Sequence, residues 1–361
     1  MLDFGLEIEC LIQGHNQDSV AATVAAAGVP CRAAGYNHAL DRNKWKVVSD
    51  ASVRGIGTGF ELVSPPLTEA GFDQIEKVCA ALAALGATIN RTCGLHVHIG
   101  ARHYDFSVMK KLAQLYYENE PVIDSLLPTS RRGNSNNYCK SLKYNVDVNA
   151  LQNATDMTQL AVAVCRDPDN RNAPSRFTKL NFCAFWRHGT VEFRHHSGSI
   201  EAQKIIKWIQ LCSKLVDVAV ATASEPVTLL SNVPPAYNTA YWRRGRRTRL
   251  LFEMLTRPEG VTMVELQAAL NRSSRPSGPA QHATRSGDRV VEAGRRGGAT
   301  VYKLAAPQVA VAQPTEPATF ESFVDKLGFS DEEKSFWAAR KARLETAIAA
   351  SSTGYTVEAV A

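Results

Sequence analysis

CGLHVHIG, residues 93–100, alternates apolar and polar side chains, which is the pattern of a β-strand with two different faces. The apolar residues of such a strand would pack on a hydrophobic core, and His96 and His98 would emerge together on the opposite face. Two imidazoles at this spacing can bind a metal ion or a phosphate group, although packed or surface histidines fit the pair alone equally well. The strand therefore marks a face on which a site could be built.

Three other predicted strands repeat this alternation with charged residues. Their polar side chains would share one face of each strand: Glu7 and Glu9, Glu61, and Glu192 and Arg194. Each strand alone is typical of a solvated face or a structural ion pair. Together, the four strands would bring several carboxylates close to one another. Such carboxylates repel one another unless a cation lies between them, and oxygen-rich clusters with few imidazoles suit Mg²⁺ or Mn²⁺. Arginines beside such metals match a polyphosphate, so the residues predict metal-dependent phosphoryl chemistry on an antiparallel sheet.

The remaining patterns predict an α+β fold with an antiparallel sheet flanked by helices. Strands are expected at 2–12, 44–49, 59–64, 87–100, 179–187 and 190–196. Helices are expected at 17–27, 67–85, 107–127, 148–164, 201–223, 319–327 and 331–349. The last two strands are expected to form a hairpin around His188 and Gly189.

The basic residues are concentrated in one segment. Residues 240–303 hold 13 Lys and Arg against 5 Asp and Glu, a local charge of +8 within a total of +6, so that the rest of the chain carries −2. Proline-containing stretches at 225–240 and 305–318 are interpreted as linkers. The predicted organisation is a large domain at 1–224, a small basic domain at 241–304 and C-terminal helices at 319–350.

The composition argues against several classes of protein. No apolar run approaches the ~20 residues of a membrane helix, and the first residues lack the basic start and apolar centre of a signal peptide. The eight cysteines are scattered without a C-x-x-C pair, which is typical of reduced thiols. We therefore expect a cytoplasmic protein without a membrane partner.

Four ordered motifs resemble those of the amidoligase family, a branch of the glutamine-synthetase-like carboxylate–amine ligases. They are FGLEIE at 4–9, Asp50 with GFELVSP at 59–65, CGLHVHIG at 93–100 and TVEFRHHSG at 190–198. The resemblance covers about residues 1–223. It implies a curved antiparallel sheet of the glutamine-synthetase catalytic type and ATP- and Mg²⁺-dependent amide formation through an acyl phosphate. The substrates would be a small-molecule or peptide-linked carboxylate and an amine.

The resemblance also implies roles for individual residues. The ligands of the metal ion, which would be Mg²⁺ or Mn²⁺, would be Glu7, Glu9, Glu61, His96 and Glu192. His98 and Arg194 would face the phosphates, with Arg194 stabilising the transferring group, and Asp50 would assist a metal or accept a proton from the amine. Glutamine synthetases proper carry an arginine two residues before the glutamate, where this chain has Thr190. The resemblance therefore does not imply that glutamate and ammonia are the substrates.

Polar residues outside these motifs are candidates for binding ATP or substrate. Arg131 and Arg132, with Asn137 and Tyr138, lie in a polar loop that is interpreted as a lid over phosphate or a carboxylate, or as a solvated loop. Lys179 and Asn181 alternate on a predicted strand and are expected to point into the same cavity. For His195, His196, Cys10 and Cys93 we expect packing or supporting roles rather than catalysis.

The basic segment is similar to a winged helix. Short helices are expected at 250–256 and 262–270, and strands at 289–293 and 299–304 joined by GRRGG, whose arginines would meet phosphates. The expected recognition helix near 272–286 contains prolines, which disfavour a long helix. The segment is interpreted as a nucleic-acid-binding module or as a docking domain for a protein.

Two other functions remain open for the whole chain. One is a non-catalytic nucleic-acid-binding protein that uses the ligase fold as a scaffold, although the intact set of acidic and imidazole residues argues against a decayed site. The other is a cupin-like metal hydrolase built on His96 and His98. A cupin would carry a glutamate three or four residues after the second histidine, where Arg102 stands in this chain.

Overall fold

The computed structural model describes residues 3–35, 39–166, 174–225, 251, 254–255, 259–269, 290–304 and 318–351. The chain divides into two compact units, Met1–Leu229 with Pro317–Ala361 and Leu230–Glu316. The expected recognition helix at 272–286 and nearly all of both expected linkers lie outside the described residues. No helix among the described residues is long and apolar enough to cross a membrane.

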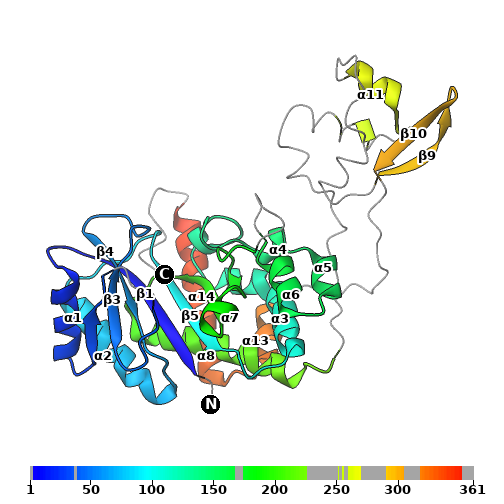
Figure 1. The fold of residues 1–361 in the computed structure, drawn as a ribbon. Helices are drawn as coiled ribbons and strands as arrows, with labels where there is room; N and C mark the ends of the chain where they lie inside the picture. Colours follow the sequence, from blue (N-terminus) through cyan, green and yellow to red (C-terminus); the bar gives the residue numbers. More distant parts are fainter. Residues whose placement is uncertain are drawn as a thin grey trace. The chain divides into compact units, whose positions relative to one another are not determined.

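The first unit is built on a sheet of seven strands among the described residues, in the order β2-β3-β4-β1-β5-β7-β6 (Figure 1). Their bounds are β1 Phe4–Ile12, β2 Cys31–Ala33, β3 Trp45–Ser49, β4 Thr58–Val63, β5 Gly94–Gly100, β6 Leu180–Asn181 and β7 Thr190–Ser197. Every neighbouring pair is antiparallel except β2 and β3, which are parallel. The prediction of an α+β fold is confirmed, and the sheet is mixed rather than purely antiparallel.

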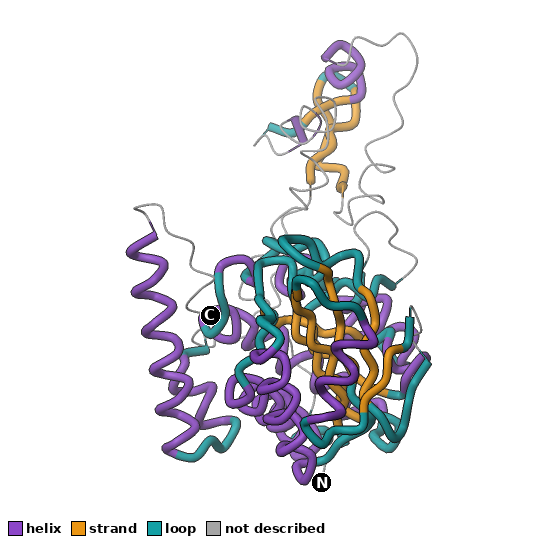
Figure 2. Tube along the Cα trace, turned by 90° about the vertical axis from the view of Figure 1, so that its left-hand side faces the viewer, coloured by secondary structure: helices purple, strands orange, loops and turns teal. Residues whose placement is uncertain are grey.

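Helices flank this sheet (Figure 2). Their bounds are α1 Gln17–Ala26, α2 Phe72–Ala84, α3 Phe106–Ser125, α4 Leu142–Asn145, α5 Val148–Asn153, α6 Met157–Val164, α7 Ala184–His188 and α8 Ala202–Ala221, with short 3-10 turns at Glu69–Gly71 and Thr129–Arg131. The long helix α8 packs against α2, α3 and β5. The large core therefore lies between the helices and one face of the sheet, and the other face is left to polar side chains.

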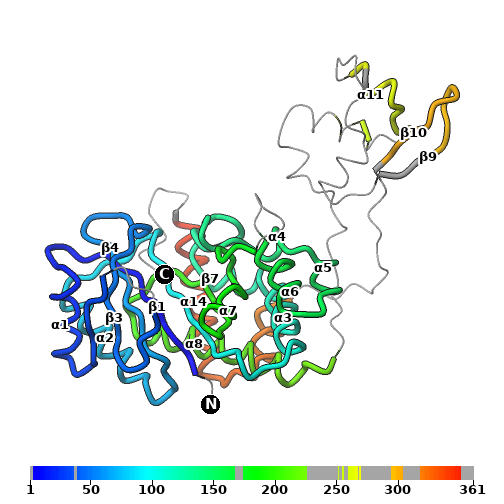
Figure 3. Tube along the Cα trace, in the orientation of Figure 1, coloured from blue at the N-terminus to red at the C-terminus, as the bar shows by residue number. Residues whose placement is uncertain are grey.

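Two C-terminal helices, α13 (Phe320–Lys326) and α14 (Asp331–Ser351), return to the first unit (Figure 3). Trp337 of α14 packs edge-on against Trp208 of α8, with ring centroids 6.4 Å apart. Arg340 is buried, and its Nε donates to the carbonyl of Leu126, 2.9 Å away, at the end of α3. These contacts show that the helices predicted at 319–327 and 331–349 belong to the main core.

Three predicted elements of this unit are wrong in part. The strand expected at 179–187 is only β6, because the side-chain oxygen of Asn181 accepts from the backbone of Cys183 and turns the chain into α7. The strand expected from residue 87 begins at Gly94, and Thr88 forms only an isolated bridge to Leu11. The helix expected at 148–164 is two helices, α5 and α6, because the side chain of Asp156 accepts from the backbone amide of Gln159 and caps a new helix that begins at Met157.

In the second unit, the described residues form a small sheet with the order β8-β10-β9. Its elements are β8 Val261–Thr262, α11 Met263–Ala269, β9 Val290–Arg296 and β10 Ala299–Leu304. Leu251, Leu255, Val261 and Leu266 form its apolar core. The hairpin predicted around the GRRGG sequence is therefore present, with Arg295 exposed near its turn and Arg296 paired with Glu265 at 2.8 Å.

Candidate functional site

A cavity of about 660 Å³ opens on the polar face of the large sheet. It brings together most of the residues predicted for the site: Glu7, Glu9, Asp50, Glu61, His96, His98, Arg131, Glu192 and Arg194. Tyr138 and Asn181 also line it. Side chains from five strands (β1, β4, β5, β6 and β7) and from the loops beside them therefore share one space.

Strand register is the reason why these side chains meet. Glu9 on β1 is paired with Glu61 on β4, and Glu7 on β1 is paired with His96 on β5. Across the next strand pair, His98 is paired with Glu192. Residues that face each other across a sheet have their Cβ atoms about 5 Å apart, so the alternation seen in each strand becomes a row of carboxylates and imidazoles across the sheet.

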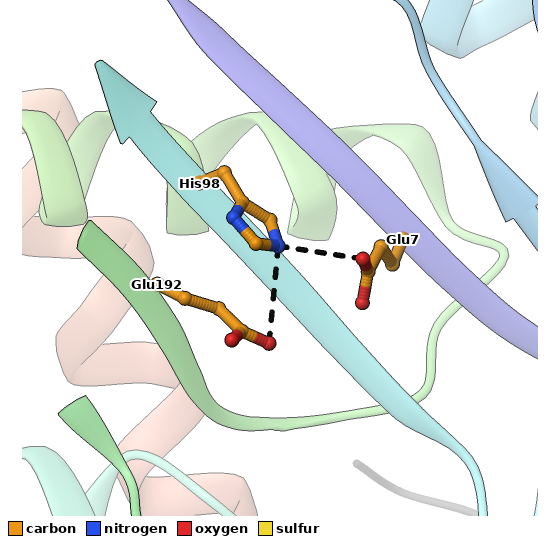
Figure 4. A group of neighbouring side chains, drawn as sticks. All are labelled: Glu7, His98 and Glu192. Atoms are coloured by element: carbon orange, nitrogen blue, oxygen red, sulfur yellow. Dashed lines mark ion pairs between the residues drawn. The ribbon is translucent and has the colours of Figure 1, made fainter. Parts of the chain in front are cut away.

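Within this row, two groups of side chains could each hold a metal ion. Glu7, His98 and Glu192 form one group, shown in Figure 4 in front of the strands that carry them, and Glu7, Glu61 and His96 form the other. In each group the possible ligand atoms lie within 4.8 Å of one another. Glu7 belongs to both groups and lies between the two histidines, which are 2.8 Å (His96 Nδ1) and 3.4 Å (His98 Nε2) from its carboxylate.

The ring of His98 is oriented by Thr190. The Nδ1 atom of His98 lies 2.9 Å from the hydroxyl of Thr190, so Nε2 is the nitrogen that faces the carboxylates. This buried Nε2 makes no well-directed hydrogen bond within the described residues, and it lies 3.4 Å from Glu7 and 3.8 Å from Glu192. A ring nitrogen that is held in this way has the geometry of a metal ligand.

Burial, together with neighbouring negative charge, raises the pKa of one member of the row. Burial and the neighbouring carboxylates of Glu7 and Glu9 raise the pKa of Glu61 well above its ordinary value. Burial also opposes ionisation of Glu7, but contacts with His96 and His98 outweigh it and hold the pKa of Glu7 well below its ordinary value. The row therefore carries more carboxylate than its histidines and Arg194 neutralise, and a bound cation would relieve the repulsion.

Three polar contacts fix the positions of the carboxylates. The side-chain amide of Asn181 donates to Glu192 at 2.6 Å, and Arg194 pairs with the other oxygen of Glu192. The backbone amide of Gly94 donates to Glu9 at 2.6 Å. A Cβ atom at Gly94 would lie 2.7 Å from Nε2 of His96, so this strand approaches the site closely at a position that suits glycine.

Asp50 and Arg131 reach the cavity from loops. One carboxylate oxygen of Asp50 accepts from the backbone of Ser52 at 2.7 Å. The guanidinium of Arg131 is buried and donates to the backbone carbonyl of Cys93. Both residues therefore lie on the cavity wall where the sequence predicts them, and each is held by a backbone contact.

Other predicted residues are not brought to the cavity. Arg132 binds the carbonyls of Leu127 and Ser125 at the end of α3, and Asn137 is not among the lining residues. Lys179 points into the protein interior, where it pairs with Glu120 and Asp124. Neither Arg132 nor Lys179 therefore lines the cavity.

The cavity also contains cationic residues that the sequence patterns did not single out. They are Arg42, Lys46, Arg102, Arg176 and Arg187. Alternation could have found Lys46, because it lies between the buried Trp45 and Val47 of β3 and must face the polar side. The others lie in loops or in the short helix α7, where no periodic pattern marks a side chain that faces a cavity.

Comparison with known proteins agrees with the motifs. A search of curated proteins finds no match to the chain. A family model described as "Putative amidoligase enzyme" matches residues 1–216, which include all seven strands of the large sheet and both groups of side chains that could hold a metal ion. Since this match covers more than half of the chain and contains the four motifs in order, the chain belongs to this amidoligase family.

Proposed function

We propose that the chain is an ATP- and Mg²⁺-dependent carboxylate–amine ligase that forms an amide through an acyl phosphate. The observation that carries this proposal is the cross-strand row in which two groups of ligands share Glu7. Membership of an amidoligase family supports the reaction class. In the reaction, a substrate carboxylate takes the γ-phosphoryl group of ATP and releases ADP, and an amine then displaces phosphate to give the amide and a proton.

The donor set fits divalent cations of the Mg²⁺ type. Glu7, His98 and Glu192 would hold one ion, and Glu7, Glu61 and His96 would hold another, with Glu9 beside the second group. Carboxylate oxygens outnumber imidazoles in the row, which favours Mg²⁺ or Mn²⁺ over a closed zinc site. Bound there, such ions would neutralise charge between the phosphate oxygens and the substrate carboxylate.

The residues of the chain supply the rest of the chemistry. Arg194 lies beside Glu192 with its guanidinium at the cavity, where it would stabilise charge on the phosphoryl group as it moves between two anions. Arg131, which also lines the cavity, would contact phosphate or the substrate carboxylate. Asp50, with one oxygen held by the backbone of Ser52, would accept the proton of the attacking amine or assist a metal.

Calorimetry with ATP and Mg²⁺ tests this proposal. Wild-type protein is expected to bind ATP only with the metal, and Glu7→Gln and Glu192→Gln are expected to lose that binding while they keep the fold. Glu76→Gln, which changes an exposed glutamate on α2, is the matched control. A wild type that binds no ATP, or full binding by both site variants, would overturn the proposal. Binding that follows the expected pattern would justify screening acids and amines for ADP release.

We propose separately that the second unit binds nucleic acid. The supporting observation is its topology: a sheet of order β8-β10-β9, with helix α11 following β8 in sequence, resembles part of a winged helix. The test compares the affinity of the full chain for duplex DNA and RNA with that of a variant lacking 241–304, at several salt concentrations. An affinity for nucleic acid that is unchanged by the deletion would contradict this proposal and favour a protein-docking role. ATP binding at the cavity should survive the deletion.

A further inference from the structure

One wall of the cavity is made by two loops that are far apart in sequence but joined through their backbones. The amide of Lys140 donates to the carbonyl of Phe177 at 2.8 Å, and the amide of Lys179 donates to the carbonyl of Lys140 at 2.9 Å. This bridge places Tyr138 beside Phe177, with ring centroids 5.3 Å apart and planes at 80°. The two rings therefore contact each other edge to face in the wall of the cavity, although they are 39 residues apart in the sequence.

This wall is anchored from behind by two acids of α3, the buried Glu120 and the partly buried Asp124. Asp124 accepts from the backbone amide of Gly133 at 2.9 Å, and Glu120 accepts from that of Leu142 at 2.7 Å, so both ends of the loop that carries Tyr138 are held by α3. Lys179, which follows Phe177 closely in sequence, pairs with the same two acids. Because both loops are tied to one buried cluster, the surface is organised before any ligand arrives.

The exposed chemistry of the surface is aromatic and cationic. The Tyr138 side chain is 49% exposed although it lines the cavity. The guanidinium carbon of Arg176 lies 5.1 Å from the centre of the Phe177 ring, and both residues line the cavity as well. Exposed aromatic rings with an arginine alongside are what proteins use to stack flat nucleobases. We call Tyr138, Arg176 and Phe177 the aromatic platform.

The aromatic platform adjoins the residue that is best placed to contact phosphate. Nε of Arg194 donates to the carbonyl of Tyr138 at 3.3 Å, and the same guanidinium pairs with Glu192 of the metal-binding row. Arg194 thus connects the platform to the row of carboxylates. A ligand with a flat base at one end and phosphates at the other matches this order of groups along the wall.

We infer that the aromatic platform is the nucleobase subsite of the cavity, and that the base of the bound nucleotide stacks there while its phosphates lie toward Arg194 and Glu192. This inference rests on the proposed function, because it takes a nucleoside triphosphate as the ligand. It assigns Tyr138 and Arg176 to the base, rather than to phosphate or to a substrate carboxylate.

The experiment separates the base from the phosphates. Calorimetry measures the affinities for ATP and for inorganic tripolyphosphate, each with Mg²⁺, in the full-length wild type and in Tyr138→Ala, Tyr138→Phe and Arg176→Gln. Stacking of one base is worth about 5- to 150-fold in affinity. Tyr138→Ala should therefore lower the affinity for ATP by this factor and leave the affinity for tripolyphosphate unchanged. Tyr138→Phe, which keeps the ring, should bind ATP like the wild type.

A matched control is Tyr144→Ala, which removes a 74% exposed tyrosine that does not line the cavity and should bind both ligands normally. Tyr138 is exposed, so its loss should not unfold the protein, and thermal unfolding of each variant checks this. Unchanged ATP affinity in Tyr138→Ala and Arg176→Gln would overturn the subsite and leave the ligase proposal standing. Equal losses for ATP and tripolyphosphate would also overturn it, because they would assign the platform to phosphate. A wild type that binds neither ligand would overturn both proposals.

Discussion

The ammonium group of Lys179 lies 2.8 Å from the carboxylate of Glu120, with both side chains almost completely buried. Asp124 pairs with the same ammonium and also accepts from His195. A lysine that the strand pattern assigns to nucleotide binding is thus the counter-ion of one buried and one partly buried acid. These acids in turn hold the backbone of the cavity wall, so Lys179 influences the site only through its contribution to the fold.

Removal of this buried cation should destabilise the protein strongly. Lys179→Met leaves Glu120 and Asp124 without their counter-ion, and breaking a buried pair in this way typically costs about 3–5 kcal/mol. Urea unfolding measures the loss. The control is Lys77→Met, which breaks an exposed pair with Asp73 and should change stability by less than about 1 kcal/mol. Similar effects of the two substitutions would show that the ion pairs of Lys179 stabilise the fold no more than the exposed pair does.

His195 should make the stability depend on pH. Burial and the charge of Lys179 lower the pKa of His195 to about 4, from an ordinary value of 6.5. Between these values the unfolded chain binds more protons than the folded one, so the histidine's contribution is complete above pH 6.5 and is lost as the pH falls to about 4. The shift corresponds to about 3 kcal/mol.

The free energy of unfolding, measured from pH 7 to pH 4, tests this expectation. The wild type should lose stability more steeply across that range than His195→Gln, and the two curves should converge toward pH 4. His103→Gln, which replaces an exposed histidine, should run parallel to the wild type. Parallel curves for His195→Gln and the wild type would contradict the assignment of a neutral buried imidazole.

The polar face of the sheet could be predicted from sequence because it follows from geometry. Side chains alternate along every strand, so Glu7 and Glu9, or His96 and His98, must share a face once the strand is recognised. Two strand registers then bring these faces together: the pairing of β1 with β5 places Glu7 opposite His96, and the pairing of β1 with β4 places Glu9 opposite Glu61. Local alternation and long-range pairing agree at these positions.

Alternation fails where the strands become irregular. Val97 pairs with Phe193 but Leu95 pairs with His196, so β7 contains one extra residue at a bulge. As a result, His195 and His196 both contact Trp208 in the helical layer, although they are adjacent in sequence. The three residues of β2 were missed for a related reason, because so short a strand shows no period.

Lys179 and Arg132 could not be placed from sequence because their partners come from another element. The acids that pair with Lys179 lie on α3. The carbonyls that accept hydrogen bonds from Arg132 are those left without helical partners where α3 ends. A basic residue near a predicted site is equally compatible with a phosphate contact or a helix cap. Only the packing of α3 decides between them.

Glu61 is expected to lower the stability of the metal-free protein. Its folded-state pKa lies well above its ordinary value of 4.5, so stability falls as the pH rises from 4.5 through the raised pKa. Glu61→Gln should therefore raise the unfolding temperature of metal-free protein at pH 8 by about 2–4 °C, which is roughly 1 kcal/mol, and should reduce the stabilisation by Mg²⁺. Glu76→Gln should do neither. A destabilised Glu61→Gln would mean that the carboxylate makes a favourable contact in the absence of metal.

Gly94 should determine whether the group formed by Glu7, Glu61 and His96 can hold a metal ion. An added Cβ would lie 2.7 Å from Nε2 of His96 and 3.3 Å from the carboxylate of Glu9, so Gly94→Ala must displace the imidazole from Glu7 and Glu61. The group formed by Glu7, His98 and Glu192 lies farther along the strands and should remain. Titration with Mn²⁺, followed by electron paramagnetic resonance, should show one site unchanged and one weakened by about 10- to 100-fold. Gly5→Ala, on the adjacent strand, would place its Cβ 3.7 Å from His98 in ordinary contact, and should leave both sites intact. If Gly94→Ala bound Mn²⁺ like the wild type, His96 would not be a metal ligand, and the row would hold its cation through Glu7, His98 and Glu192 alone.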